Sequence, residues 1–449
     1  MVKYFLIIHS QDVMSMNNVK LVLPEKFDLV KGDTFQLFYR GVVEAVNPYC
    51  YDILCLCNIG KNFQRYFEVT PTENGEYPLT VFVYDNEKKV LAEGKTTLVV
   101  HEAKAQPKEE VNILCVGDSL TAGGHWVEEA YRRLSASDGQ PIGNGFSNFN
   151  FVGTCKKGAV GFEGYGGWQW ENYLNSREDA LPAVWVNSEN NKSDDDQHSI
   201  WKDSTGTLWQ IETVEPFRIK FNRVGGHSAP MPEAGTYLTH VENANEPSDI
   251  YVGGTYYETP NPFCNKEEQT IDFKNYCQRN GYDRIDAVYF FLTWNGMFGK
   301  EDIIIEDFCN KLSQDGRKLV DILHAQYPDA KVKIMGLQVP SVNGGMGNGY
   351  GGKLPYCDTY GMTRFVLQLN RVYEEWCNED KYKEFTEFIN ISGQFDSDFN
   401  MPHAHKCVNT RSNETEIVGT NGVHPMVEGY YQIADAVYRN MVKEFCQDE

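Results

Sequence analysis

Residues 111–126 read VNILCVGDSLTAGGHW, and this stretch decides how the rest of the chain is interpreted. The apolar run that ends at Val116 predicts a short buried strand, and a helical pattern begins near Trp126. Between them, Gly117-Asp118-Ser119-Leu120 indicates a tight turn. A serine on such a turn has its hydroxyl at the carboxyl end of the strand, where open α/β sheets place their chemistry. The same residues are typical of an ordinary N-cap and turn, so the stretch alone leaves both interpretations open.

Length and charge limit the classes of protein to which this chain can belong. Its 449 residues allow roughly three domains, or two with insertions. Hydrophobic residues make up 41% of the chain and aromatic residues 13%, which is enough for a sizeable core. The formal net charge of -22 argues against nucleic acid and anionic membranes as partners, because both require basic patches. A neutral or non-phosphorylated substrate fits this charge, and no apolar run approaches the roughly 18 residues of a membrane helix.

We expect neither a signal peptide nor a disulfide framework. The start, MVKYFLIIHSQD, has a short apolar run and no small-residue cleavage site. The sequence as it stands therefore predicts a cytoplasmic protein, or a secreted one if a leader is missing. The 12 cysteines follow no regular spacing, and the close pair Cys55 and Cys57 lacks a second pair at the spacing of a zinc site. Reduced, structural thiols are the resulting prediction.

Residues 1–101 are predicted to form a small β-sandwich of the immunoglobulin-like type. Short apolar runs between residues 19 and 100 are separated by turn signals at regular spacing. The run LTVFV at 79–83 alternates as a half-buried strand does. The polar, charged segment at 102–110 predicts a linker between this domain and the serine strand.

From residue 111 onward, strand patterns alternate with helical patterns. The sequence predicts strands at 149–153, 287–293, 331–339 and 385–391, and helices at 308–327, 363–377 and 430–445. This alternation predicts an α/β domain over 111–449 with a parallel, doubly wound sheet. A polar segment at about 182–262, with only short strand-like pieces, is interpreted as an irregular insertion.

A catalytic serine needs a base, and His424, in the sequence NGVHP at 421–425, is the candidate. It lies on the segment that leads into the last predicted helix, where we expect it to face the end of the serine strand. His403 and His405 form a His-x-His pair, but no acidic or cysteine ligand lies at a fitting spacing, so we expect no metal site. The glycine-rich segment at 343–354 lacks the Ser or Thr of a phosphate loop and is interpreted as a mobile rim of the active site.

The arrangement of these residues resembles the SGNH, or GDSL, hydrolases. The shared features are Gly117-Asp118-Ser119-Leu120 near the start of an α/β domain and a histidine just before its final helix, over about residues 112–445. The α/β-hydrolases differ, because their nucleophile elbow requires glycine where this chain has Thr121. The resemblance implies a flavodoxin-like, doubly wound sheet. An immunoglobulin-like domain ahead of it is similar to carbohydrate-active bacterial members.

The resemblance also implies an oxyanion hole in which the N–H of Ser119 is joined by two further donors. The sequence EGYGG at 163–167 matches the second block of the family and points to the N–H of Gly164. The third block is Gly-x-Asn-Asp, and here it reads Thr293-Trp294-Asn295-Gly296 after a predicted strand. Asn295 is kept as the side-chain donor, whereas the glycine and the aspartate are replaced. Asn-Gly is also a strong turn signal in its own right.

The group that orients the histidine is left open. The family has Asp-x-x-His, whereas this chain has Asn421 three residues before His424. Asparagine can accept the Nδ1–H bond but brings no charge to stabilise an imidazolium, and in the serine-protease template the same change lowers turnover about ten-thousand-fold. Either Ser119 and His424 act as a dyad helped by Asn421, or a carboxylate such as Asp396 or Asp398 takes the third role.

The resemblance therefore implies a serine esterase that needs no cofactor or metal. A carbohydrate O-acetylesterase is the first expectation, with an acylated carbohydrate as its partner. Four tryptophans lie within or beside the blocks: Trp126, Trp168, Trp170 and Trp294. Their aromatic faces are suited to stacking on sugar rings, although tryptophan is as often simple core or rim packing. One alternative is a lipase or esterase acting on other small esters. Another is a glycan-binding protein on a catalytically weak or inactive SGNH fold, which the replacements at Thr293, Gly296 and Asn421 favour. The oligomeric state stays open.

Overall fold

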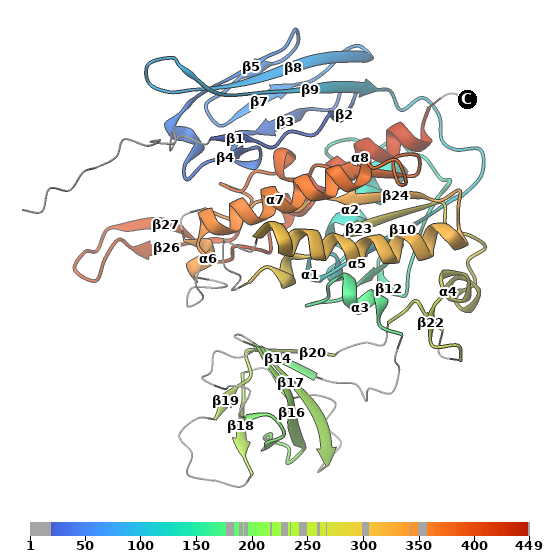
Figure 1. The fold of residues 1–449 in the computed structure, drawn as a ribbon, viewed down its shortest axis with the longest axis vertical. Coiled ribbons are helices and arrows are strands. Elements are labelled where there is room, and N and C mark those ends of the chain that lie inside the picture. The colour runs from blue at the N-terminus through green and yellow to red at the C-terminus, as the bar shows by residue number, and fades with distance from the viewer. Residues whose placement is uncertain are drawn as a thin grey trace, which may run out of the picture. The chain divides into compact units, whose positions relative to one another are not determined.

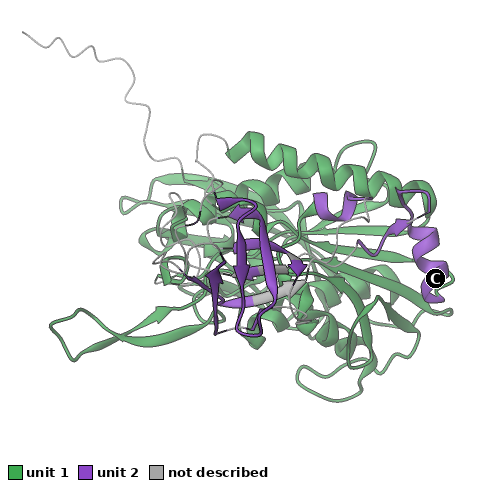
Figure 2. Cartoon of the chain, turned by 90° about the horizontal axis from the view of Figure 1, so that it is seen from below, with its two compact units in different colours: residues 1–170, 282–449 green, residues 171–281 purple. Residues whose placement is uncertain are grey.

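The computed structural model describes residues 19–176, 184–187, 192, 196–215, 218–225, 232–233, 235–241, 249–257, 261–265, 267–298, 305–342, 344–348 and 357–447. The chain divides into two compact units, one of residues 1–170 with 282–449 and one of Glu171–Gly281 (Figure 2). Within the described residues, no helix combines the length and the apolar character that crossing a bilayer requires.

The first unit begins with an all-β domain of stacked sheets (Figure 1). One sheet has the order β2-β9-β8-β5 and another the order β3-β7-β6. The bounds are β1 Lys20–Leu21, β2 Lys26–Val30, β3 Phe35–Phe38, β4 Val43–Glu44, β5 Asp52–Leu56, β6 Lys61–Asn62, β7 Tyr66–Val69, β8 Gly75–Tyr84 and β9 Val90–His101. Alternation along β8 buries Leu79, Val81 and Val83, which share one core with Phe35 and Leu37 of the other sheet. The all-β prediction is confirmed, and the immunoglobulin-like topology stays a prediction.

The rest of this unit is built on a mainly parallel sheet with the order β12-β13-β10-β23-β24-β25, in which β11 also pairs with β10. The bounds are β10 Val111–Gly117, β11 Phe149–Val152, β12 Cys155–Lys157, β13 Val160–Gly164, β23 Ala287–Phe291, β24 Lys331–Met335 and β25 Thr386–Ile389. Only the edge pair β12–β13 is antiparallel. The predicted α/β class with a parallel sheet is confirmed, and the serine strand β10 lies inside the sheet.

Helices cover both faces of this sheet. As a result, every residue of the central strands β10 and β23 is buried. The main helices are α2 His125–Ser135, α5 Ile305–Gln326, α7 Thr359–Cys377 and α8 Val427–Phe445. Phe291 contacts Trp126 of α2, whereas the preceding residue, Phe290, contacts Trp170, which in turn contacts Trp376 of α7. Since neighbouring residues of a strand point to opposite faces, α2 and α7 lie on opposite sides of the sheet.

The β domain is packed tightly against the parallel-sheet domain, and α8 runs along the seam (Figure 1). Asp33, which follows β2, accepts hydrogen bonds from Arg133 of α2 and Arg439 of α8 at 3.0 and 2.9 Å. Ser392 Oγ donates to the backbone oxygen of Gly41 at 2.8 Å. A Cβ atom on Gly41 would lie 1.8 Å from the oxygen of Ser392, so only glycine permits this approach. Residues 102–110 thus join two domains that are already in contact.

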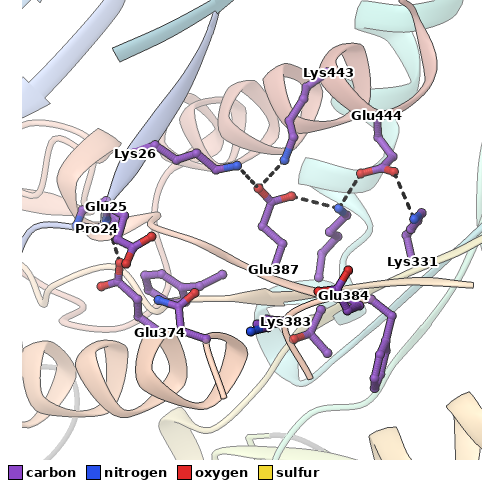
Figure 3. Close-up of a pocket in the computed structure, with 15 residues that line it drawn as sticks. Pro24, Glu25, Lys26, Lys331, Glu374, Lys383, Glu384, Glu387, Lys443 and Glu444 are labelled. Carbon is purple, nitrogen blue, oxygen red and sulfur yellow. Dashed lines mark hydrogen bonds and ion pairs between the residues drawn. The ribbon is translucent and has the colours of Figure 1, made fainter. Parts of the chain in front are cut away.

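A cavity of about 270 Å³ lies at this seam, near the amino ends of β24 and β25 (Figure 3). Its lining is dominated by lysine and glutamate side chains that pair with one another. Glu387 accepts from Lys333 at 2.9 Å, contacts Lys26 at 3.1 Å and also pairs with Lys443, and these lysines lower the pKa of its carboxyl although burial opposes this. Because Ser119 follows the carboxyl end of β10, this cavity belongs to the opposite edge of the sheet.

The second unit contains an antiparallel sheet with the order β19-β18-β15-β16-β17-β14-β20. The bounds are β14 Val184–Asn187, β15 Ile200–Lys202, β16 Leu208–Glu215, β17 Arg218–Gly225, β18 Tyr237–His240, β19 Ile250–Tyr251 and β20 Gly254–Tyr257. Trp201, Trp209 and Phe221 are buried in a core of its own. The second unit, Glu171–Gly281, covers more residues than the insertion expected at about 182–262. It is also more regular than the sequence indicated. Its strands alternate buried and polar residues, so the sequence there has the average composition of a polar segment.

Candidate active site

Ser119 lies on a sharp turn at the carboxyl end of β10. It begins the short helix α1, Ser119–Ala122, and Asp118 caps this helix by accepting the N–H of Leu120 at 2.9 Å. Glycine is required before the cap, since a Cβ atom on Gly117 would lie 2.0 Å from Thr121 Oγ1 and 2.7 Å from the backbone oxygen of Phe291. The local sequence thus brings the backbone of α1 directly onto the strand end.

His424 lies beside this serine. Its Nε2 lies 2.8 Å from Ser119 Oγ, although the two residues are 305 positions apart in the sequence. The histidine is on the segment between β27, Thr415–Gly419, and α8. A hydrogen bond fixes this segment: the buried Gln338, beyond β24, donates its Nε2 to the backbone oxygen of Val423 at 2.8 Å.

Burial lowers the pKa of His424 to about 4. The imidazole is therefore neutral at pH 7 and can accept the proton of the Ser119 hydroxyl through Nε2. A neutral histidine in hydrogen-bonding contact with a serine hydroxyl is the arrangement that activates a serine nucleophile.

Gly164 lies beside the turn that carries Ser119. It is the last residue of β13 and pairs in parallel register with Gly117. A Cβ atom at this position would lie 2.7 Å from the backbone N of Ala122, so β13 approaches α1 as closely as a backbone can. The residue predicted as the second oxyanion donor is thus adjacent to the helix that Ser119 begins.

Asn295 is linked to the same turn through Asp118. Its side-chain Nδ2 lies 3.1 Å from the backbone oxygen of Trp168 and 3.4 Å from Asp118 Oδ2. The first hydrogen bond has normal length and the second is long, so one N–H of the amide is held only weakly within the chain. Burial raises the pKa of Asp118 to about 7, although the N–H groups that donate to this carboxyl, such as that of Leu120, favour its charged form.

The structure shows why residues 293 and 296 differ in their surroundings from the Gly-x-Asn-Asp pattern described above. Thr293 occurs with φ of +123°, in a region that favours the glycine of the family pattern. At Gly296, where the pattern has aspartate, a Cβ atom would lie 2.4 Å from Gln169 Oε1. The side chain of Gln169 therefore fills the space that a larger residue at 296 would need.

The side chain of Asn421 binds the backbone of the histidine segment. Its Oδ1 accepts the N–H groups of Val423 and His424, each at 2.9 Å. The two carboxylates considered for the third role are used elsewhere. Asp396 accepts from both terminal nitrogens of Arg65, and Asp398 accepts from Arg65, Arg40 and Tyr49, all of which belong to the β domain.

The four tryptophans do not form a stacking surface, which corrects that expectation. Trp126, Trp168, Trp170 and Trp294 are between 0% and 5% exposed. Two of them donate inside the core, Trp126 to Thr121 Oγ1 and Trp170 to the hydroxyl of Tyr373. The sequence did not indicate which way these rings face.

The remaining candidates lie around the site without joining it. His403 and His405 are exposed on β26, His403–Cys407, which pairs with β27 in a projecting hairpin (Figure 1). Among the described residues, no group of three or more His, Cys, Asp or Glu side chains is arranged to hold a metal ion. Of the glycine-rich segment 343–354, only 344–348 lies within the described residues. A Cβ atom on Gly422 would lie 2.2 Å from Met346 Sδ, so this part packs against the histidine segment.

Gln338 contacts the histidine segment and was not predicted as a site residue. It lies within the strand predicted at 331–339 and, in the structure, just beyond the carboxyl end of β24, a position that often carries site residues in parallel sheets. A lone glutamine there gives no specific signal in the sequence. Its donation to Val423, next to His424, becomes visible only in the fold.

Comparison with known proteins adds little to this geometry. No family model matches the chain, and no curated protein matches it. Among solved structures, a possible lipase from Chitinophaga pinensis DSM 2588 is 11% identical over 74% of this chain and 98% of that one, with a TM-score of 0.31. A peptidoglycan O-acetylesterase is 13% identical over 75% of this chain and 91% of that one, with a TM-score of 0.27. At such TM-scores the likeness carries no functional argument, so the function is inferred from the site alone.

Proposed function

We propose that the protein is a serine carboxylic ester hydrolase in which Ser119 is the nucleophile and His424 the general base. The observation that carries this proposal is the hydrogen bond of 2.8 Å between His424 Nε2 and Ser119 Oγ at the carboxyl edge of the parallel sheet. The lowered pKa of His424 supports it, because a neutral imidazole is the form that accepts the proton.

The reaction has two halves. Ser119 Oγ attacks the ester carbonyl carbon while its proton moves to His424 Nε2, and the carbonyl oxygen becomes an oxyanion. The N–H groups of Ser119 and Gly164 and the amide of Asn295 are assigned to stabilise this charge. His424 then protonates the leaving alcohol as the C–O bond breaks. Water, deprotonated by His424, attacks the acyl-enzyme and releases the acid and Ser119.

An acyl ester of a carbohydrate, acetyl first, is the substrate class that we propose. The support is the SGNH resemblance with a preceding β domain and the net charge of -22, which disfavours phosphorylated substrates. Because the four tryptophans are buried, aromatic stacking on sugar rings does not support this choice of substrate. Small non-carbohydrate esters are the alternative substrate. The glycan-binding alternative is favoured by one observation: Asn295 Nδ2 already has two contacts within the chain, to the backbone oxygen of Trp168 at 3.1 Å and, more weakly, to Asp118 Oδ2 at 3.4 Å.

The test is acetate release from a panel of acetylated polysaccharides, with p-nitrophenyl acetate hydrolysis and fluorophosphonate labelling measured in parallel. Wild type and Ser119→Ala are compared, with Ser135→Ala at the end of α2 as the matched control. We expect turnover and labelling in wild type and Ser135→Ala and neither in Ser119→Ala. Turnover that survives in Ser119→Ala would overturn the assignment, and a wild type without turnover or labelling would favour the glycan-binding alternative.

A further inference from the structure

Thr293 has an exceptional backbone conformation for a residue with a side chain. Its φ is +123° and its ψ is -13°. The other described non-glycine residues with positive φ, Lys88, His198 and Gln269, have φ between 52° and 69°, which is the ordinary left-handed region. Thr293 is also β-branched and fully buried. Such a conformation is costly and persists only where the surroundings hold it in place.

A buried chain of hydrogen bonds holds Thr293. Its Oγ1 lies 2.6 Å from the hydroxyl of Tyr373 on α7, and the indole Nε1 of Trp170 donates to the same hydroxyl at 2.7 Å. Because an indole N–H only donates, the phenol oxygen accepts from Trp170, and the hydrogen bond between the two hydroxyls can run in either direction. All three side chains are at most 1% exposed, so water does not offer these groups another partner. Burial also raises the pKa of Tyr373, which keeps its phenol protonated.

The turn that carries Thr293 also carries Asn295. The backbone N–H of Thr293 and the Nδ2 of Asn295 each lie 3.4 Å from Asp118 Oδ2. Asn295 Nδ2 lies 3.1 Å from the backbone oxygen of Trp168, two residues before Trp170. The chain from Trp170 to Thr293 therefore ties the Asn295 turn to the segment whose carbonyl Asn295 binds.

We propose that Tyr373 is a positioning residue that acts through the hydroxyl of Thr293 to hold the Asn295 amide at the oxyanion site. The inference rests on the proposed function and adds a residue that does not touch the substrate. A glycine at 293 would adopt this φ without strain. Threonine at this position gives α7 a hydroxyl to hold, so the position of the turn depends on Tyr373.

The first comparison is between wild type, Tyr373→Phe and Thr293→Ser in p-nitrophenyl acetate hydrolysis. Tyr373→Phe keeps the ring and removes the hydroxyl, and we expect kcat to fall on the order of 10- to 100-fold, less than the loss of a whole oxyanion donor. KM is expected to stay within about twofold, because the bound substrate does not contact the buried hydrogen bonds from Trp170 through Tyr373 to Thr293. Thr293→Ser keeps the hydroxyl, so its kcat should stay close to that of wild type.

The second comparison asks whether Tyr373 acts through Thr293. In a double-mutant cycle with Thr293→Gly, adding Tyr373→Phe should lower kcat little further, since the link is already absent. Tyr289→Phe is the matched control. Tyr289 is also fully buried and donates its hydroxyl to Asn440 at 3.0 Å, and its loss should lower stability without lowering kcat.

The outcomes separate the two proposals. If wild type turns over the ester and Tyr373→Phe has the same kcat, or if the effects of the two substitutions are additive, the positioning role is overturned while the ester hydrolase stands. An equal loss of kcat in Tyr289→Phe would also overturn it, since the effect would then come from general loosening of the core. A wild type without serine-dependent turnover overturns the proposed function and this inference together.

Discussion

Arg65 donates from both terminal guanidinium nitrogens to the two carboxylate oxygens of Asp396, at 2.9 and 3.0 Å. The pair joins the β domain to the segment that leads from β25 toward the site. The backbone N–H of Asp396 binds Gln432 Oε1 of α8 at 2.9 Å, and the backbone oxygen of Asn400 accepts the N–H of Met426 at 3.0 Å. Because Met426 follows His424 by two residues, the β domain supports the segment that carries the proposed general base.

Replacing Arg65 with alanine should therefore weaken the fold. Asp396 is largely buried, and without Arg65 its carboxylate loses a charge-assisted bidentate pair. We expect the free energy of unfolding to fall by about 2 kcal/mol, the usual range for hydrogen bonds to charged groups. Chemical denaturation measures this, with Arg411→Ala on the exposed hairpin turn as the control. Equal unfolding free energies for the two variants would show that the pair does not stabilise the domain contact.

Gly164→Ala should impair both the fold and the reaction. The added methyl would lie 2.7 Å from the N of Ala122, so α1 and Ser119 with it must shift. We expect the free energy of unfolding to fall by roughly 1–3 kcal/mol, as for overpacking. We also expect kcat to fall by a larger factor than KM changes. Gly166→Ala is the matched control, because a Cβ there meets nothing within 4 Å. Two variants with the same kcat would contradict the close packing of β13 on α1.

The pH dependence of kcat/KM should reflect the lowered pKa of His424. The free enzyme needs the neutral imidazole, and burial lowers its pKa to about 4, so the acid limb should lie near pH 4. The same shift lowers stability in acid, because the unfolded histidine binds a proton near its ordinary pKa while the folded one does not until about pH 4. An acid limb at the ordinary histidine value would show that the ring is solvated in the working enzyme.

The sequence was sufficient for the parts of the site that depend on local pattern and chain direction. The strand-turn-helix pattern around Ser119 is local, and parallel strands carry their carboxyl ends to one edge, which brings His424 to the serine. Partners that depend on packing could not be predicted. Asp396 is 331 positions from Arg65, and nothing in either neighbourhood indicates that they meet.

Side-chain direction was the second limit. A tryptophan in a loop-like stretch is apolar and aromatic whether it packs inward or faces a ligand, so Trp168 and Trp294 gave the same signal for both roles. The antiparallel sheet of the second unit was hidden for a related reason. In β16 the buried Trp209 and Ile211 alternate with polar residues, and the average over the segment is that of a polar loop.

Gln338→Met tests whether catalysis requires the hydrogen bond that fixes the segment carrying Val423 and His424. Methionine matches glutamine in length and shape but cannot donate to the backbone oxygen of Val423, which would then be a buried acceptor without its partner. We expect a loss of about 1–2 kcal/mol in stability and a fall in kcat, because His424 follows Val423 directly. Gln368→Met on α7 is the matched control: the Nε2 of Gln368 is buried and has no hydrogen-bond partner among the described residues, so its removal should not destabilise the protein. If Gln338→Met keeps the kcat and the unfolding free energy of Gln368→Met, the position of His424 is set by the Asn421 turn and not by Gln338.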